Sequence, residues 1–501
     1  MSETIAQRRH MLMRYGSMIA GPLLCALIYF SMPSTYSLAD GSVAQFSSAG
    51  RACLGVLVWM AIWWCFETVP IAVTSMLPMV LFPLFQVTKV SAAMAPYASD
   101  TVFLFLGAFM LAGGVMLWGL DRRIALVVMS FVGTTPKRMV FGLMLTTTFL
   151  SAFMSNTATA AMMVPVAMAL ITLVHSTKAA GDPDAVTHER NFSLCILLAL
   201  AYGASIGGMA TLIGSPPNGI YMRFMEQTYG QVVSIASWMK VGVPVTLLLF
   251  IVSFFVLTGL MFRNMGGSVP GGKEWVRNEL RSMGKLSTGE KAVGLCFLIA
   301  AVLWFSGAQL RGINIDGWQP FKYLTDAVIA MGMGIVPFLI PVDRKGTMAM
   351  DWKTANEAIS WDVLLLFGGG LSLASAIQHT GVAQLIGAQV AVLAGSPFPV
   401  VLFGVVFIVT FATGVTSNTA LAAMMMPLLA AVANALGLPP QPILMGTALA
   451  ASAAFILPIS TPPNAIVFGT GKIKIADMFR AGILINFVAI FVITGVMLLL
   501  D

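Results

Sequence analysis

The chain has 501 residues, of which 58% are hydrophobic and 9% charged, whereas an ordinary soluble domain carries about 25% charged residues. This composition excludes a soluble globular protein and places the chain in a lipid bilayer. The formal net charge of +7 does not indicate nucleic-acid binding, because the Lys and Arg residues cluster in loops between apolar runs.

The first apolar run, residues 15–32, follows Arg8, Arg9 and Arg14. Many further apolar runs follow, so we interpret this one as an uncleaved first helix and not as a signal peptide. Runs that match a hydrocarbon core of ~30 Å recur along the chain. Examples are residues 52–66, 241–262, 325–341 and 481–500.

The basic residues predict the topology. With a cytoplasmic N-terminus, all but six of the 27 Lys and Arg residues lie on the cytoplasmic side, where positive charge is retained. The six exceptions are Arg51, Lys89, Arg223, Lys240, Arg311 and Lys322. The C-terminal Asp501 then lies on the periplasmic side of an inner membrane, which requires an odd number of full spans.

Three motifs occur twice in the same order. Residues 155–165 (SNTATAAMMVP) and 417–427 (SNTALAAMMMP) are identical at nine of eleven positions. GSPPN at 214–218 corresponds to STPPN at 460–464, and FLFLG at 103–107 corresponds to LLLFG at 364–368. Three ordered matches, at offsets of 246 to 262 residues, indicate a duplicated unit, which in transporters flanks a site near the bilayer midplane.

Each Ser-Asn-Thr motif is predicted to form the tip of a re-entrant hairpin. Residues 139–177 are uncharged and are bounded on both sides by cytoplasmic basic residues, so both ends lie in the cytoplasm. Arms at 139–154 and 158–174 would each be about 24 Å long. The second hairpin, about 400–436, has no basic residue in its flanks. It therefore enters from the other side, and the repeat is predicted to be inverted.

The Ser-Asn-Thr motifs and the Pro-Pro pairs suit ions of opposite charge. Ser, Asn and Thr favour helix starts, so each tip presents a helix N-terminus with a partial positive charge to an anion. The Pro-Pro pairs, predicted to lie inside helices, cannot donate to the preceding carbonyls. The freed carbonyls, at Leu212, Ile213, Pro458 and Ile459, suit an alkali cation. Asn218 and Asn464 lie where the half-helices restart, so four helix N-termini are predicted to face one anion.

Other residues carry less functional signal. The five cysteines form no C-x-x-C pair and are predicted to be core residues. Gly368–Gly370 favours close helix packing. Four acidic residues are expected at span ends in the interface: Glu67, Asp100, Asp326 and Asp362. The four histidines have no zinc-ligand spacing and no hydrolase motif is present, so an enzyme is not expected.

At these motifs the sequence resembles the divalent anion/sodium symporter family. The resemblance is carried by residues 451–467 (ASAAFILPISTPPNAIV), the duplicated Ser-Asn-Thr and residues 67–70 (ETVP), and it covers essentially the whole chain. It implies an all-α homodimer in a bacterial inner membrane, with inverted repeats, about eleven spans, two hairpins and an elevator-type movement. The implied organisation is scaffold at 1–135, transport domain at 136–240, scaffold and cytoplasmic loop at 241–359, and mostly transport domain at 360–501.

The resemblance also implies site residues. A first sodium site would use Ser151, Ser155, Asn156 and the backbone of Gly214. A second would use Thr413, Thr416, Asn418 and the backbone of Ser460. The substrate would meet Asn156, Thr157, Ser215, Pro216, Ser417, Asn418, Thr419, Thr461 and Pro462. Gly414 departs from the family pattern, because many relatives carry a Glu just before the second tip.

The function expected from this resemblance is transport of C4-dicarboxylates such as succinate, malate and fumarate, coupled to sodium and without a cofactor. The expected partners are the dicarboxylate, sodium, the bilayer and a second copy of the chain, with no nucleic acid. A sodium-independent di- or tricarboxylate exchanger and a sulfate or citrate transporter remain alternatives within the family. An anion channel or a membrane enzyme would be a different class.

Overall fold

The computed structural model describes residues 2–37, 42–176, 185–266, 272–390 and 395–500. The predicted periplasmic residue Asp501 lies outside this range. The regular secondary structure of the described residues is almost entirely helical, and their one sheet is a two-stranded antiparallel hairpin, β1 (Thr35–Ser37) and β2 (Val43–Gln45), with Thr35 paired to Gln45. The predicted all-α class is confirmed.

The first repeat runs from the N-terminus to the π-helical turn η2. Its elements are α1 (Ser2–Ser31), α2 (Ser48–Cys65), α3 (Ile71–Ser75), α4 (Leu77–Leu84), α5 (Val90–Met94), η1 (Ala95–Ala98), α6 (Asp100–Leu117), α7 (Leu120–Val132), α8 (Pro136–Ser151), α9 (Asn156–Ser176), α10 (Ala185–Gly207), α11 (Pro216–Tyr229), α12 (Ile235–Phe255) and η2 (Val256–Met261).

The rest of the chain contains the second copy of each duplicated motif. Its elements are α13 (Gly272–Ser282), α14 (Thr288–Arg311), α15 (Asp326–Ile335), η3 (Val336–Leu339), α16 (Trp352–Ala358), α17 (Trp361–His379), α18 (Val382–Val390), α19 (Phe398–Ala412), α20 (Asn418–Ala435), α21 (Pro440–Ser452), η5 (Pro458–Ser460), α22 (Pro462–Phe468) and α23 (Ile475–Leu500).

Ten helical segments in the described part of the chain are long and apolar enough to cross a bilayer. Two of them, α9 and α20, are the second arms of the hairpins, which leaves eight. The shorter apolar segments in the described ranges are Ile71–Leu84, Asp326–Leu339 and Phe398–Ala412, and α21 and α22 form a broken helix. The number of about eleven full spans stays a prediction.

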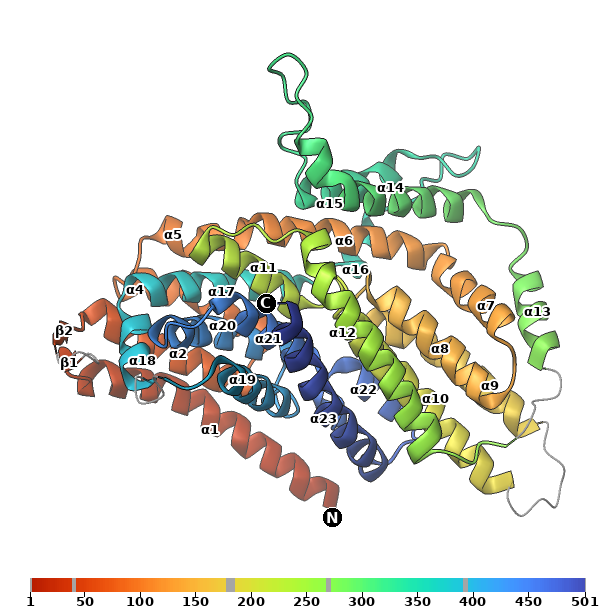
Figure 1. Cartoon of the computed structure of the whole chain (residues 1–501), viewed down its shortest axis with the longest axis horizontal. Coiled ribbons are helices and arrows are strands. Elements are labelled where there is room, and N and C mark those ends of the chain that lie inside the picture. The colour runs from red at the N-terminus through yellow and green to blue at the C-terminus, as the bar shows by residue number, and fades with distance from the viewer. Residues whose placement is uncertain (1, 38–41, 177–184, 267–271, 391–394, 501) are drawn as a thin grey trace.

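The two hairpins are approached from different ends of the molecule. Helix α7 precedes the hairpin of α8 and α9, and α18 precedes the hairpin of α19 and α20. Figure 1 shows α7 and α18 toward opposite ends of the long axis. The inverted orientation of the two repeats stays a prediction.

Small residues bring the central helices into close contact. A Cβ on Gly369 of α17 would lie 2.3 Å from Ser75 O, and a Cβ on Gly368 would lie 2.0 Å from the Tyr97 ring. On the first repeat, a Cβ on Gly107 of α6 would lie 2.4 Å from the Ala330 carbonyl carbon in α15. These glycines therefore permit close helix packing, as predicted for Gly368–Gly370. The five cysteines are unpaired, and all but the half-buried Cys65 are buried.

Candidate functional site

The first hairpin tip lies between α8 and α9. Helix α8 ends at Ser151, α9 begins at Asn156, and Ser155 caps α9 because its Oγ accepts from Ala158 N at 3.2 Å. Ser151 is fully buried. Its Oγ lies 2.7 Å from Asn156 Oδ1 and 2.7 Å from the carbonyl oxygen of Ala204 in α10. The start of α9 is thereby joined to α10.

The second tip repeats this arrangement. Helix α19 ends at Ala412 and α20 begins at Asn418. The Oγ1 of the fully buried Thr413 lies 2.7 Å from Asn418 Oδ1 and 2.7 Å from Ala451 O in α21. Thr413 and Asn418 each follow their counterparts in the first repeat by 262 residues. The duplicated sequence therefore forms a duplicated set of hydroxyl, amide and backbone oxygens.

Three oxygens surround one end of the Asn156 amide. They are Ser151 Oγ at 2.7 Å, Ala204 O at 3.1 Å and Gly214 O at 3.2 Å. With Nδ2 at this end, the amide donates to these oxygens and satisfies them. With Oδ1 at this end, four oxygens converge and only the Ser151 hydroxyl brings a proton to them. A bound cation would stabilise the second arrangement. The residues present therefore fit a monovalent cation held by neutral oxygens.

Two glycines allow the surrounding backbone to lie close to the Asn156 amide. A Cβ on Gly208, just after α10, would lie 2.4 Å from Asn156 Oδ1. A Cβ on Gly214 would lie 2.8 Å from Gly208 O and 3.0 Å from Ala152 O. A side chain at either position would displace the oxygens that surround Asn156.

The helix break differs from the sequence-based prediction. The Pro-Pro pairs were expected inside a helix, but α10 already ends at Gly207 and Pro216 begins α11. Pro462 likewise begins α22 after α21 has ended at Ser452. Proline is favoured in the first turn of a helix, where the missing N–H has no intrahelical partner. The carbonyls of the connecting segment therefore have no partners within a helix, among them Gly214 O.

Thr211 connects the first tip to the first break. Its Oγ1 donates to Ala152 O and accepts from Gly214 N at 3.2 Å. The corresponding residue in the second repeat is Leu457, which has no hydroxyl. At this position a side-chain hydroxyl links the tip to the break in the first repeat and not in the second, although the two tips share one geometry. Sequence reasoning missed Thr211, because a single hydroxyl between two apolar residues carries no motif.

Several predicted ligands bond to their local backbone. Thr416 Oγ1 donates to Ala412 O at 3.0 Å, and Ser460 Oγ donates to Leu457 O at 2.5 Å. Both hydroxyls therefore donate within their own segments. Ser155 Oγ is likewise used as the cap of α9.

The substrate residues predicted from the sequence differ in exposure. Ser215 and Thr461 are buried helix caps, whereas Thr157 and Pro462 are exposed. The rest are half-buried: Asn156, Pro216, Ser417, Asn418 and Thr419. The tips thus have an accessible polar surface next to the buried hydroxyls of Ser151 and Thr413.

The two repeats meet at this region. Helix α9 packs against α22, and α11 packs against α20 and α21, so each restarted half-helix contacts the hairpin of the other repeat. The Oγ atoms of Ser215 and Ser452 lie 3.0 Å apart across this interface. Sequence reasoning did not identify Ser452 or the backbone oxygens of Ala204 and Ala451.

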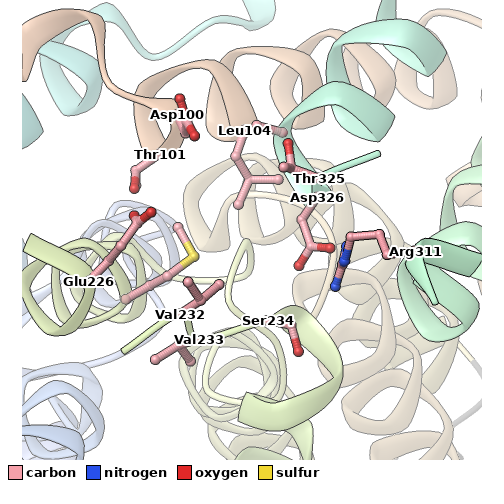
Figure 2. A pocket seen from close by; sticks show the side chains of 12 residues that line it. Asp100, Thr101, Leu104, Glu226, Val232, Val233, Ser234, Arg311, Thr325 and Asp326 are labelled. Atoms are coloured by element: carbon pink, nitrogen blue, oxygen red, sulfur yellow. The ribbon is translucent and has the colours of Figure 1, made fainter. Parts of the chain in front are cut away.

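A separate pocket of about 270 Å³ lies between α6, α11, α12, α14 and α15 (Figure 2). None of the predicted site residues lines it. Its carboxylates have structural roles: Asp326 Oδ2 accepts from Ile235 N at 2.9 Å, and Glu226 pairs with Arg223 at 2.7 Å. Asp100 and Asp326 lie in the first turns of α6 and α15, where negative charge is favourable.

The remaining acidic candidates also lie at helix ends. Asp362 is in the first turn of α17, and Glu67 follows the end of α2 with φ of 44°. No group of three or more His, Cys, Asp or Glu residues in the described ranges is arranged to hold a metal ion.

Two broken helices and two re-entrant hairpins within a bundle of apolar helices define a secondary transporter. The sodium:sulfate symporter transmembrane region matches residues 39–500. The chain belongs to this family of transporters, and it is a multi-pass membrane protein and not an enzyme. The family resemblance identified from the motifs is confirmed.

Similar proteins cover most of the chain. The sodium-dependent dicarboxylate transporter SdcS of Staphylococcus saprophyticus is 37% identical over 452 residues, which cover 89% of this chain and 85% of SdcS. SdcS of Staphylococcus aureus is 37% identical over 446 residues, covering 89% and 84%.

Solved structures agree on the fold. Neisseria gonorrhoeae MtrF has a TM-score of 0.60 at 13% identity, with 97% of this chain and 94% of MtrF covered. The Alcanivorax borkumensis YdaH transporter has a TM-score of 0.55 at 13% identity, with 97% of each chain covered. At this identity the likeness concerns the fold alone.

Proposed function

We propose that this chain transports C4-dicarboxylates such as succinate, malate and fumarate across the inner membrane, coupled to sodium and without covalent chemistry. The observation that carries the proposal is the duplicated oxygen set, in which Ser151 and Asn156 in one repeat correspond to Thr413 and Asn418 in the other. The sodium-dependent dicarboxylate transporters that are 37% identical support this assignment.

The cation sites are the buried parts of the two tips. The first would use Ser151, Ser155, Asn156 and Gly214; the second would use Thr413, Thr416, Asn418 and Ser460. Hydroxyl, amide and carbonyl oxygens offer several ligands without a formal charge, as sodium sites at broken helices require. Because Thr416 and Ser460 use their hydroxyls locally, we expect their backbone oxygens to be the ligands.

The anion would lie on the accessible side of the same tips. Helices α9, α11 and α20 begin at Asn156, Pro216 and Asn418, and the shorter α22 begins at Pro462. Free N–H groups at helix N-termini and the hydroxyls beside them favour carboxylates. The substrate set is Asn156, Thr157, Ser215, Pro216, Ser417, Asn418, Thr419, Thr461 and Pro462. Sodium bound beneath the tips would add positive charge and so couple the two ligands.

The proposed movement is that of an elevator. Residues 136–240 and most of 360–501 would form the transport domain, and 1–135 with 241–359 would form the scaffold of a homodimer. The N-terminus would be cytoplasmic and the C-terminus periplasmic, with inverted repeats. The opposite placement of α7 and α18 supports this organisation (Figure 1).

The experiment is uptake of labelled succinate by the purified full-length protein in proteoliposomes. We expect saturable uptake that requires an inward sodium gradient and is lost when choline replaces sodium. Uptake that persists unchanged in choline would replace symport by exchange, and flux that does not saturate would indicate a channel. Because the family description names sulfate, competition by malate, fumarate, citrate, tartrate and sulfate then ranks the anions.

A further inference from the structure

The asparagines that follow the two Pro-Pro pairs make the same bonds in both repeats. Asn218 Nδ2 donates to the carbonyls of Gly208 at 2.9 Å and Thr211 at 2.8 Å, ten and seven residues earlier. Asn464 Nδ2 donates at 3.0 Å to the carbonyls of Ala454 and Leu457, also ten and seven residues earlier. Each amide therefore holds the connecting segment that precedes its own helix.

From this match we propose that Asn218 and Asn464 are positioning residues that set the geometry of the two cation sites. The inference rests on the proposed function, because it concerns the sodium ligands. Neither asparagine is one of the ligands assigned above.

The connecting segments before α11 and α22 carry backbone oxygens that are proposed as cation ligands. Gly208 lies directly against the Asn156 amide, and Gly214 O is 3.2 Å from one end of that amide. Both glycines belong to the segment between α10 and α11. Asn218 Nδ2 donates to the Gly208 and Thr211 carbonyls of this segment. In the second repeat, Asn464 Nδ2 also lies 3.2 Å from Ser460 Oγ, so it contacts the proposed ligand residue directly. Loss of either amide would free these segments to move away from the tips.

The chemistry of the bonds explains why asparagine is present. The connecting segments are not helical, so their carbonyls need partners from elsewhere. A primary amide supplies two hydrogens from one nitrogen, which matches two carbonyls. A hydroxyl supplies one hydrogen, and a carboxylate supplies none.

The other end of each amide is left unused. Asn218 and Asn464 are fully buried, and within the described residues neither Oδ1 has a hydrogen-bond partner. A buried unpaired oxygen is unfavourable and calls for a compensating role. Its occurrence at equivalent positions of both repeats favours a shared role in function over an accident of packing.

The test uses full-length variants in proteoliposomes, with initial rates of labelled succinate uptake measured against external sodium. Asn218→Asp and Asn464→Asp preserve shape but remove both donors. We expect the sodium concentration for half-maximal uptake to rise at least about tenfold, as loss of one or two hydrogen bonds at a ligand segment predicts. The succinate KM at saturating sodium should change much less. Equal sodium dependence in both variants and the wild type would overturn the proposal.

Asn191→Asp is the matched control, because the Asn191 amide donates to a single loop carbonyl, Asn264 O at 3.0 Å. It should leave the sodium dependence unchanged. If the Asp variants at Asn218 and Asn464 do not fold, Asn218→Ser and Asn464→Ser, which keep one donor, decide the matter.

For these Ser variants the measurement is the rise in melting temperature on adding sodium chloride instead of choline chloride to the purified protein. A smaller rise than in the wild type supports the proposal, and a full rise contradicts it. A wild type without any sodium dependence would instead reject the proposed function, so the two failures are distinguishable.

Discussion

Ser215 Oγ of the first repeat lies 3.0 Å from Ser452 Oγ of the second repeat, and both serines are buried. Ser215 directly precedes α11 and Ser452 ends α21. The contact therefore links the start of one restarted half-helix to the helix that leads into the other break.

Removing this contact should weaken substrate binding. Ser452→Ala deprives Ser215 Oγ of its partner, so we expect the succinate KM to rise about fivefold, the equivalent of ~1 kcal/mol for one hydrogen bond. The sodium dependence should change little. Ser205→Ala is the matched control, because Ser205 occupies the corresponding position in α10 and its buried Oγ has no partner among the described residues. Equal KM values for the two variants would contradict this role for Ser452.

The tip asparagines should be essential for uptake. Asn156→Ala and Asn418→Ala each remove an amide group whose nearer end lies 2.7 Å from a buried hydroxyl. We expect sodium-dependent succinate uptake to fall by about 10- to 100-fold in each, because a proposed ligand of both sodium and substrate is lost. Asn434→Ala, at the exposed end of the same helix as Asn418, should behave like the wild type. Near-normal uptake in both tip variants, with an intact size-exclusion profile, would reject the site.

Thr211 should stabilise the first break. Thr211→Val removes the hydroxyl that donates to Ala152 O and accepts from Gly214 N. We expect the free energy of unfolding to fall by about 1–3 kcal/mol, because buried backbone groups lose their partner. Thr447→Val is the control, since Thr447 Oγ1 bonds only within its own helix, to Ile443 O at 2.8 Å. Thermal unfolding of the purified proteins compares them, and equal losses for both variants would count against the role of Thr211.

A methyl group at Gly208 should disrupt the first cation site. In Gly208→Ala the new Cβ would lie 2.4 Å from Asn156 Oδ1, so the amide has to move. We expect a higher sodium requirement for uptake, by about tenfold or more if one ligand is displaced. Gly404→Ala places its Cβ in open space on α19 and should have no effect. Sodium titration of uptake distinguishes the two, and an unchanged titration in Gly208→Ala would argue against a ligand role for Asn156.

Two neighbouring arginines of α7 should differ strongly in their contribution to stability. Arg123 Nε lies 2.5 Å from the carboxylate of Glu290, and the two side chains are 14% and 3% exposed. The pair of Arg122 and Glu279 is 55% and 29% exposed. Arg123→Ala leaves a buried carboxylate unpaired and should cost about 3–5 kcal/mol. Arg122→Ala should cost ~0–1 kcal/mol.

Thermal or denaturant unfolding of the two arginine variants in the same detergent measures this difference. Similar losses in both would show that burial of Glu290 does not determine the energy of its pair with Arg123.

Part of the site could be predicted from residue types. Ser155 and Asn156 mark the start of α9, and Ser417 and Asn418 mark the start of α20, because these side chains favour helix starts. Their duplication located both tips before any contact was known. The sequence was less informative about the breaks, because Pro-Pro fits both a kink inside a helix and the first turn of a new one.

Contacts between distant segments could not be predicted in this way. Ala204 O and Ala451 O approach the tips from other helices, and Thr211 reaches Ala152 across 59 residues of sequence. Every residue has a backbone carbonyl, so no residue type marks the few carbonyls that become ligands.

By itself the sequence determined that the chain spans a membrane, that its functional unit occurs twice and that two helices start at Ser-Asn-Thr. These properties depend on hydrophobicity, charge and local helix preference, which act between near neighbours. Only the tertiary structure decided which oxygens meet at Asn156 and Asn418, that Ser215 faces Ser452, and that Asn218 and Asn464 hold the breaks. Such contacts depend on how whole helices pack, and small residues such as Gly208 set how closely they approach.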